Sequence, residues 1–151
     1  MDYWIEKARP EHIPEMIEFW KKIDGLGLGR SDEPWALEIM LAHNPDSCLI
    51  AWHGDTMIGT VLGGFDGRRG MIYHLAVLPS WRRRKLGKVL LERCLAVLQQ
   101  RGAAKVNLFV YRDNSGARSF YEELGWVLRE DIQAYSWDYM VSLEKTLTKS
   151  G

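Results

Sequence analysis

Apolar residues recur along this chain at two spacings, and the longer one, three or four residues, is typical of helices. It predicts one helix over residues 10–23 and a second that opens with Ser31-Asp32-Glu33-Pro34. The longest helix is expected from Ser80 to about Arg101, and a short one from Asn114 or Ser115 to Leu124. A glycine follows each of these last two helices, which is a typical way for a helix to end.

The shorter spacing, alternation of apolar and polar residues, and short continuous apolar runs predict strands. Gly54-Asp55 marks a hairpin turn between two of them. The run 71–78 is apolar on both faces, so we expect it at the centre of the sheet. The predicted strands cover residues 3–8, 47–52, 56–65, 71–78, 105–111, 126–129 and 135–143. With the helices interleaved, this order predicts an α/β (α+β) fold built on one mixed sheet.

Length and composition favour one ordinary folded domain over residues 1–151. The 20 basic and 20 acidic residues give a net charge of zero, which does not favour a nucleic-acid-binding protein. No apolar run approaches the ~20 residues of a membrane span, and we see no secretory signal pattern. Cys48 and Cys94 stand in apolar contexts without metal-ligand spacing. We therefore expect buried free thiols, no metal and a cytoplasmic protein.

Positive charge is concentrated in one segment, where a strand-like run ends at Pro79 and a helical pattern begins. Arg82-Arg-Arg-Lys85 is followed by Gly87 and Lys88. Amide groups at a helix N-terminus lack partners within the helix, and the macrodipole there favours an anion. The alternative is a solvated basic turn, although positive charge at this end opposes the dipole. The segment favours a loop that binds a phosphate of a small polyanion.

Val77-Leu-Pro79 followed by Arg82-Arg-Arg-Lys-Leu-Gly87 resembles motif A of the GNAT superfamily, the Gcn5-related acetyltransferases. The acetyl-CoA loop of that family reads Gln/Arg-x-x-Gly-x-Gly/Ala. Arg82 and Gly87 match it, whereas Lys85 replaces the first glycine, which lets the coenzyme approach the backbone closely. An outward-pointing Lys85 would still be compatible with binding and would help to neutralise a phosphate.

The segment Asp113-Asn-Ser-Gly-Ala-Arg-Ser-Phe-Tyr-Glu-Glu-Leu-Gly-Trp126 resembles GNAT motif B. In that motif an Asn opens a short helix that carries Ala and Phe-Tyr and is followed by Leu-Gly-Phe, so only the final aromatic differs. The two motifs stand in the family's order, and the whole chain resembles small bacterial GNAT proteins of the YpeA type. The resemblance implies a single GNAT domain with a mixed, mostly antiparallel sheet of six to seven strands and about four helices.

The resemblance also implies that acetyl-CoA is the cosubstrate. Main-chain groups of the central strand would pair with the pantetheine arm, amides from about Arg83 to Lys88 would bind the pyrophosphate, and the Asn114 side chain would touch the pantetheine. The cofactor-binding residues expected on this basis are Leu75, Ala76, Val77, Arg82, Arg83, Arg84, Lys85, Leu86, Gly87, Lys88 and Asn114.

Tyr121 is the residue to which the resemblance assigns acid catalysis. In the family, a tyrosine at this position lies near the coenzyme sulfur and protonates the departing thiolate. A thiol pKa of ~8.5 lies below the tyrosine value of ~10, so this donation is local and need not be complete. The alternative is a core tyrosine whose hydroxyl is satisfied by the protein.

The general base is less determined by the sequence. His74 has an unperturbed pKa suited to proton transfer near neutrality and stands on the strand that precedes the acetyl site. Strict alternation places Tyr73 and Leu75 on one face and His74 on the other, whereas a GNAT base on this strand would share the face of Tyr73. A satisfied structural His74, Tyr73 as base, a water chain and the substrate's own deprotonated fraction all stay open.

The region around the second predicted helix bears on the acceptor. In this family the first two helices and the loop between them, here Gly25–Gly29, usually form one wall of the acceptor site. We expect Trp20 in the core and Trp35 in a more open position. For Asp32 we expect a surface or capping role.

These observations together favour an acetyl-CoA-dependent N-acetyltransferase. A primary amine would attack the thioester directly, with Tyr121 as general acid and His74 as candidate base. The acceptor would be a small-molecule amine or a protein or peptide amine, with no nucleic-acid or membrane partner, and the enzyme a monomer or homodimer. The alternatives are a non-catalytic acetyl-CoA-binding module or sensor, and nucleic-acid binding through the basic turn, against which the neutral charge counts.

Overall fold

The structure is a computed structural model that describes residues 2–139. The chain forms two compact units, residues 1–111 and residues 112–151. The first unit holds all five strands of the described chain and helices α1 to α3, and the second holds α4. Among the described residues, no helix has the length and apolar character needed to cross a bilayer.

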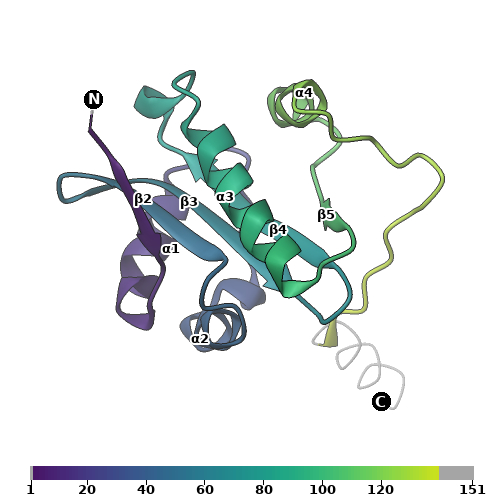
Figure 1. Ribbon diagram of the computed structural model, residues 1–151, viewed down its shortest axis with the longest axis horizontal. Coiled ribbons are helices and arrows are strands. Elements are labelled where there is room, and N and C mark those ends of the chain that lie inside the picture. Colours follow the sequence, from purple (N-terminus) through teal and green to yellow (C-terminus); the bar gives the residue numbers. More distant parts are fainter. Residues whose placement is uncertain (1, 140–151) are drawn as a thin grey trace, which may run out of the picture. The chain divides into compact units, whose positions relative to one another are not determined.

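The first unit is built on a sheet in which the strands follow one another in chain order (Figure 1). Strands β1 to β4 pair antiparallel, and β5 pairs with β4 in parallel. The sequence therefore predicted the mixed, mostly antiparallel character of the sheet correctly. The strands are β1 (Trp4–Lys7), β2 (Cys48–His53), β3 (Thr56–Phe65), β4 (Gly70–Val77) and β5 (Val106–Leu108).

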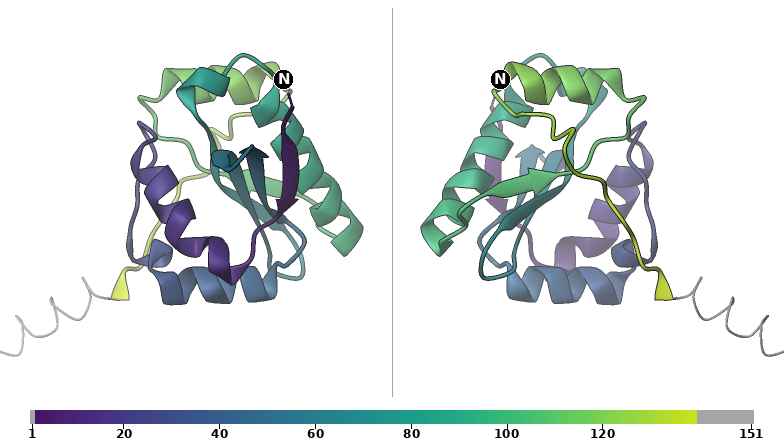
Figure 2. Two further views of the ribbon diagram at one scale, coloured as in Figure 1. Left: turned by 90° about the vertical axis from the view of Figure 1, so that its left-hand side faces the viewer. Right: turned by 90° about the vertical axis from the view of Figure 1, so that its right-hand side faces the viewer.

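Helices cover both faces of this sheet. A Cβ added at Gly63 would collide with Cys94 of α3 (Leu86–Arg101), and one added at the next residue, Gly64, would lie 3.4 Å from Met40 of α2 (Pro34–His43). Because successive residues of a strand face opposite sides, α3 and α2 lie on opposite faces. Figure 2 shows α1 (Ile13–Lys21) on the same side of the sheet as α2.

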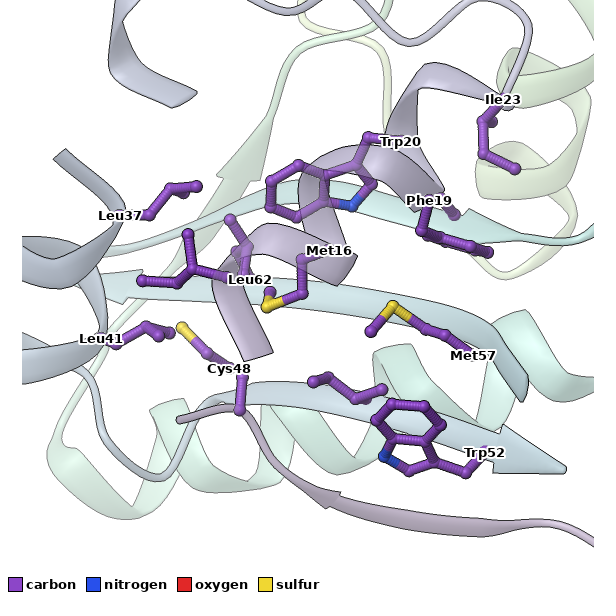
Figure 3. Close-up of a cluster of buried hydrophobic side chains, with 14 residues drawn as sticks. Met16, Phe19, Trp20, Ile23, Leu37, Leu41, Cys48, Trp52, Met57 and Leu62 are labelled. Atoms are coloured by element: carbon purple, nitrogen blue, oxygen red, sulfur yellow. The ribbon is translucent and has the colours of Figure 1, made fainter. Parts of the chain in front are cut away.

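The main hydrophobic core lies between the sheet and helices α1 and α2, on the side of the sheet called here the α1–α2 side (Figure 3). Trp20 is fully buried there, as the sequence predicted, and its indole Nε1 donates a hydrogen bond of 2.9 Å to Thr60 Oγ1 on β3. Trp35, in contrast, is 62% exposed on α2. The labelled side chains of the cluster are Met16, Phe19, Trp20, Ile23, Leu37, Leu41, Cys48, Trp52, Met57 and Leu62.

The described part of the second unit contains α4 (Ser115–Glu123), close to the predicted short helix. Asn114 caps its first turn, because the side-chain Oδ1 accepts a hydrogen bond from Ala117 N at 3.1 Å. At the other end Gly125 takes a left-handed φ of 94°, and Trp126 N donates to Tyr121 O at 3.0 Å. This is a Schellman ending, in which the Leu-Gly-aromatic sequence of motif B packs Trp126 against Tyr121, with ring centroids 5.7 Å apart.

Several predicted elements differ from the structure. The first two helices begin at Ile13 and Pro34, each after a 3-10 turn, rather than at Pro10 and Ser31. The long helix begins at Leu86 rather than Ser80, because Pro79–Trp81 form a separate 3-10 turn and Arg83 and Lys85 have left-handed φ angles. The fifth strand ends at Leu108 rather than residue 111. Residues 126–129 form no strand, because no strand of the described sheet pairs with them and an apolar pattern alone does not satisfy backbone hydrogen bonds.

The expected count of six to seven strands is therefore corrected to five among the described residues. The last predicted strand, 135–143, has no strand in residues 135–139, and its remainder lies outside the described residues.

Candidate active site

The central feature of the first unit is a stretch of β4 without a partner on one side. Strands β4 and β5 pair only from Gly70–Val106 to Ile72–Leu108, whereas β4 continues to Val77. Leu78 N donates to Ile58 O on β3 at 2.9 Å, so alternation turns the main-chain groups of Val77 and Leu75 toward the unpaired side. A strand edge of this kind offers hydrogen bonds to an extended ligand.

Leu75, Ala76 and Val77 of β4 were predicted to bind the cofactor, and two of them, Leu75 and Val77, direct main-chain groups to this open edge. The main chain of Ala76 lies opposite Thr60 in the β3–β4 pairing, and its side chain is buried in the core. The Val77 carbonyl accepts a 3.3 Å hydrogen bond from Arg82 Nε. The open edge is therefore made by Leu75 and by the N–H of Val77, and Arg82 of motif A ties the basic loop to the end of β4.

A β-bulge interrupts β4 just before this edge. Thr60 lies opposite Ala76, whereas Leu62 lies opposite Tyr73, so β4 contains one residue more than β3 over this interval. His74, within the bulge, has a left-handed φ of 46°. Its carbonyl accepts a 2.9 Å hydrogen bond from Thr60 Oγ1, which in turn accepts the Trp20 indole N–H.

The bulge overturns the prediction that His74 and Tyr73 face opposite sides of the sheet. The Tyr73 ring lies near Gly64 and Met40, on the α1–α2 side. The His74 ring lies on this side too, with its centroid 4.6 Å from that of Trp20. The alternation rule failed because the extra residue shifts the side-chain phase, and His74 therefore shares the face on which a GNAT base was expected.

His74 makes a side-chain hydrogen bond that the sequence did not predict. Its Nε2 lies 2.7 Å from Oδ1 of Asp32, which belongs to the 3-10 turn Arg30–Asp32 before α2. The other oxygen of Asp32, Oδ2, accepts a 3.0 Å hydrogen bond from Gly29 N, which confirms the expected capping role. The contact with His74 was missed because it joins segments 42 residues apart, and no local sequence signal marks such a pair.

The basic loop lies between β4 and α3 and is anchored at its start. Trp81 is buried, and the Arg84 guanidinium lies 5.0 Å from the centroid of its ring. The four basic residues Arg82 to Lys85 are exposed. The side chain of Leu86, the first residue of α3, is buried and packs on β3 near Gly59. Among the cofactor-binding residues predicted in this loop, the charged side chains thus face solvent, whereas Leu86 anchors the first turn of α3 on the sheet.

Lys85, the departure from motif A, adopts the conformation that glycine takes most easily. It has φ 63° and ψ 11° and forms the N-cap of α3 without a side-chain capping bond. The first intrahelical acceptor is Lys85 O, bonded to Val89 N at 3.0 Å. Among the described residues, the amides of Leu86, Gly87 and Lys88 have no hydrogen-bond partner, so they are donors available to an anion.

Tyr121 and Asn114 lie together on α4 in the second unit. Burial raises the pKa of Tyr121 to about 12, so its phenol carries a proton throughout the neutral range. The ring makes edge-to-face contacts with Phe120 and Trp126, with centroids 5.1 Å and 5.7 Å away. Asn114 uses its Oδ1 for the helix cap, and its amide group is a donor at the same helix end.

The model of the acetyltransferase (GNAT) family matches residues 6–126 of the chain. Acetyltransferase SG1711 of Sodalis glossinidius is 33% identical over 133 residues, covering 85% of this chain and 89% of that protein. Acetyltransferase YPTB2753 of Yersinia pseudotuberculosis is 34% identical over 133 residues, covering 85% and 90%.

Solved structures show the same fold. The PaiA N-acetyltransferase of Thermoplasma acidophilum, in complex with coenzyme A, has a TM-score of 0.76 at 20% identity and covers 87% of this chain and 94% of its own. The aminoglycoside 6'-N-acetyltransferase AAC(6')-Iy, in complex with a bisubstrate analogue, has a TM-score of 0.73 at 17% identity and covers 91% and 99%.

Proposed function

The chain belongs to the GNAT acetyltransferase family, and we propose that it is an acetyl-CoA-dependent N-acetyltransferase that acts on a primary amine. The observation that carries this proposal is the unpaired stretch of β4 beyond Ile72, next to a helix N-terminus with unpartnered amides. An extended amide-bearing arm and a pyrophosphate are the two chemical groups that fit these two features. Acetyl-CoA carries both of them.

The residues present fit the coenzyme in charge and in hydrogen bonding. Leu75 and the N–H of Val77 would pair with the pantetheine arm, and the amides of Leu86, Gly87 and Lys88 would bind the pyrophosphate. Exposed Arg83, Arg84 and Lys85 supply positive charge around those amides. We propose that Asn114 contributes its side-chain amide to the same coenzyme and that residues 1–151 act as one domain.

The transfer would proceed by direct attack. The amine nitrogen forms a bond to the thioester carbonyl carbon, and the bond from that carbon to sulfur breaks. A main-chain N–H near Leu75 would stabilise the developing oxyanion. Tyr121, which stays protonated because burial raises its pKa to about 12, would supply a proton to the departing thiolate.

His74 is the proposed general base. It lies in the bulge directly before Leu75, and its carbonyl accepts a hydrogen bond from Thr60, whose hydroxyl is itself held by the Trp20 indole N–H. The bulge places its ring on the α1–α2 side, the side of the loop that we expected at the acceptor wall. It would accept the proton that the amine nitrogen loses as it attacks the thioester carbon.

The coenzyme site is tested by titration calorimetry with acetyl-CoA on the full chain. The Arg84→Glu/Lys85→Glu variant should lose binding by at least about tenfold, because two positive charges beside a pyrophosphate become negative. Arg68→Glu/Arg69→Glu, an exposed basic pair in the β3–β4 turn, is the matched control and should bind as the wild type does. Equal affinity in all three proteins would contradict the proposed site.

A further inference from the structure

Asp32 occupies a position between two segments that the proposed reaction uses. Its Oδ1 lies 2.7 Å from His74 Nε2, and its Oδ2 accepts the Gly29 N–H at 3.0 Å. The side chains of Asp32 and His74 are 12% and 16% exposed, so water screens their contact only in part. One carboxylate therefore joins the loop Gly25–Gly29 to the bulge of β4.

The ionisation of Asp32 determines which ring nitrogen of His74 carries a proton. Burial alone would raise the Asp32 pKa, but the hydrogen bonds from His74 and from the Gly29 N–H, together with the electrostatic effect of the imidazole, lower it below its usual value. An ionised carboxylate only accepts hydrogen bonds. His74 must therefore donate through Nε2–H, which leaves the lone pair of the neutral ring on Nδ1.

The remaining contacts fix the ring without occupying Nδ1. Trp20 of α1 packs beside it, and Thr60 of β3 binds its carbonyl, whereas the charged group that faces it is Asp32. Among residues 2–139 no group hydrogen-bonds Nδ1, and no fully buried side-chain nitrogen or oxygen there lacks a partner. Nδ1 is the nitrogen available to a substrate.

We propose that Asp32 is a positioning residue that prepares His74 to act as the base. It holds the Nε2–H tautomer and stabilises the imidazolium that forms when Nδ1 takes the proton of the attacking amine. The proton moves from the amine nitrogen to Nδ1, while the Nε2 proton stays between His74 and Asp32. This inference rests on the proposed function and deepens it.

A double-mutant cycle separates this role from a structural one. Asp32→Asn keeps the side-chain size and an oxygen for Gly29 N–H but removes the charge. His74→Asn removes the base with a residue that tolerates the left-handed φ of 46°. Asp66→Asn is the matched control, because Asp66 also accepts backbone N–H groups, from Arg68 and Arg69, in an exposed turn.

Turnover of an amine should fall on the order of 10²-fold in Asp32→Asn, with the acetyl-CoA KM unchanged. In the His74→Asn background the same change should have an effect within about twofold, since it acts through a base already removed. Asp66→Asn should leave turnover unchanged. An equal loss in both His74 backgrounds would overturn the proposal, because a structural role does not depend on the imidazole.

Nitrogen-15 NMR of the imidazoles gives a readout that needs no acceptor. The His74 signals are assigned by their absence in His74→Asn and are recorded at a pH high enough for the ring to be neutral. They should show protonated Nε2 and bare Nδ1 in the wild type and lose this pattern in Asp32→Asn. A wild-type Nδ1–H tautomer would overturn the proposal. The expected tautomer together with no amine-dependent turnover would instead overturn the proposed function, and with it the base role.

Discussion

At the scale of single residues, the chain places non-glycine side chains in conformations that usually favour glycine. Arg83, Lys85 and His74 all have left-handed φ angles, and all three lie in or beside the proposed site. A left-handed residue other than glycine costs roughly 1–2 kcal/mol. The pairing of β3 with β4 on both sides of the bulge holds His74 in this conformation. The buried side chains of Trp81 and Leu86 hold the loop that contains Lys85.

Replacement of Lys85 tests whether that backbone strain is real. Lys85→Gly should raise the free energy of unfolding by up to about 1 kcal/mol relative to Lys85→Ala, because both lose the charge but only glycine relieves the strain. Chemical denaturation measures the difference. Lys88→Gly, in the right-handed first turn of α3, is the control and should lower stability. A Lys85→Gly variant less stable than Lys85→Ala would contradict the left-handed assignment.

At the scale of elements, the features that the sequence predicted best are those set by neighbours along the chain. Gly102 and Gly125 end their helices with left-handed φ angles, and Asn114 caps α4, as their patterns indicated. The bulge at His74 and its pairing with Asp32 were not predictable in this way. They depend on the register between β3 and β4 and on a contact across the fold, and neither leaves a local pattern.

Asn114 has an observed capping role and a proposed coenzyme contact, and one substitution separates the two. Asn114→Asp keeps an oxygen for the Ala117 N–H, so the stability of the protein should stay within about 0.5 kcal/mol of wild type. It removes the amide donor proposed to contact the pantetheine, so acetyl-CoA affinity should fall about tenfold. Asn114→Ala should lose both. Thermal unfolding and calorimetric titration measure the two effects, and unchanged affinity in Asn114→Asp would remove Asn114 from the coenzyme site.

At the scale of the whole molecule, the described fold keeps several weak acids neutral in its interior. Burial raises the pKa of the Cys48 thiol to about 11, and burial together with the nearby Cys48 raises that of Cys94 to about 12. Both cysteines are free and fully buried, as the sequence predicted. The packing of α3 on the paired strands β2 and β3 buries these thiols and therefore makes the fold sensitive to alkali.

The stability of the protein should decline as the pH rises above about 9. Each folded-state thiol pKa lies above its unfolded value, so the unfolded chain loses protons first and the stability present below pH 9 is lost as the pH approaches 11 to 12. Denaturant unfolding under reducing conditions between pH 7 and 10.5 measures the decline (roughly 1 kcal/mol per pH unit for each thiol). The Cys48→Ala/Cys94→Ala variant should show a smaller slope, and an equal slope would exclude the thiols as the cause.

The measurement that tests the central claim most directly is amine-dependent release of the coenzyme thiol from acetyl-CoA across a broad panel of small amines and peptide amines. We expect at least one amine to accelerate release and to gain one acetyl group by mass spectrometry. Tyr121→Phe should lower that rate on the order of 10²-fold without loss of coenzyme binding. Binding of acetyl-CoA without turnover of any amine would contradict the account and identify a coenzyme-binding module with this fold.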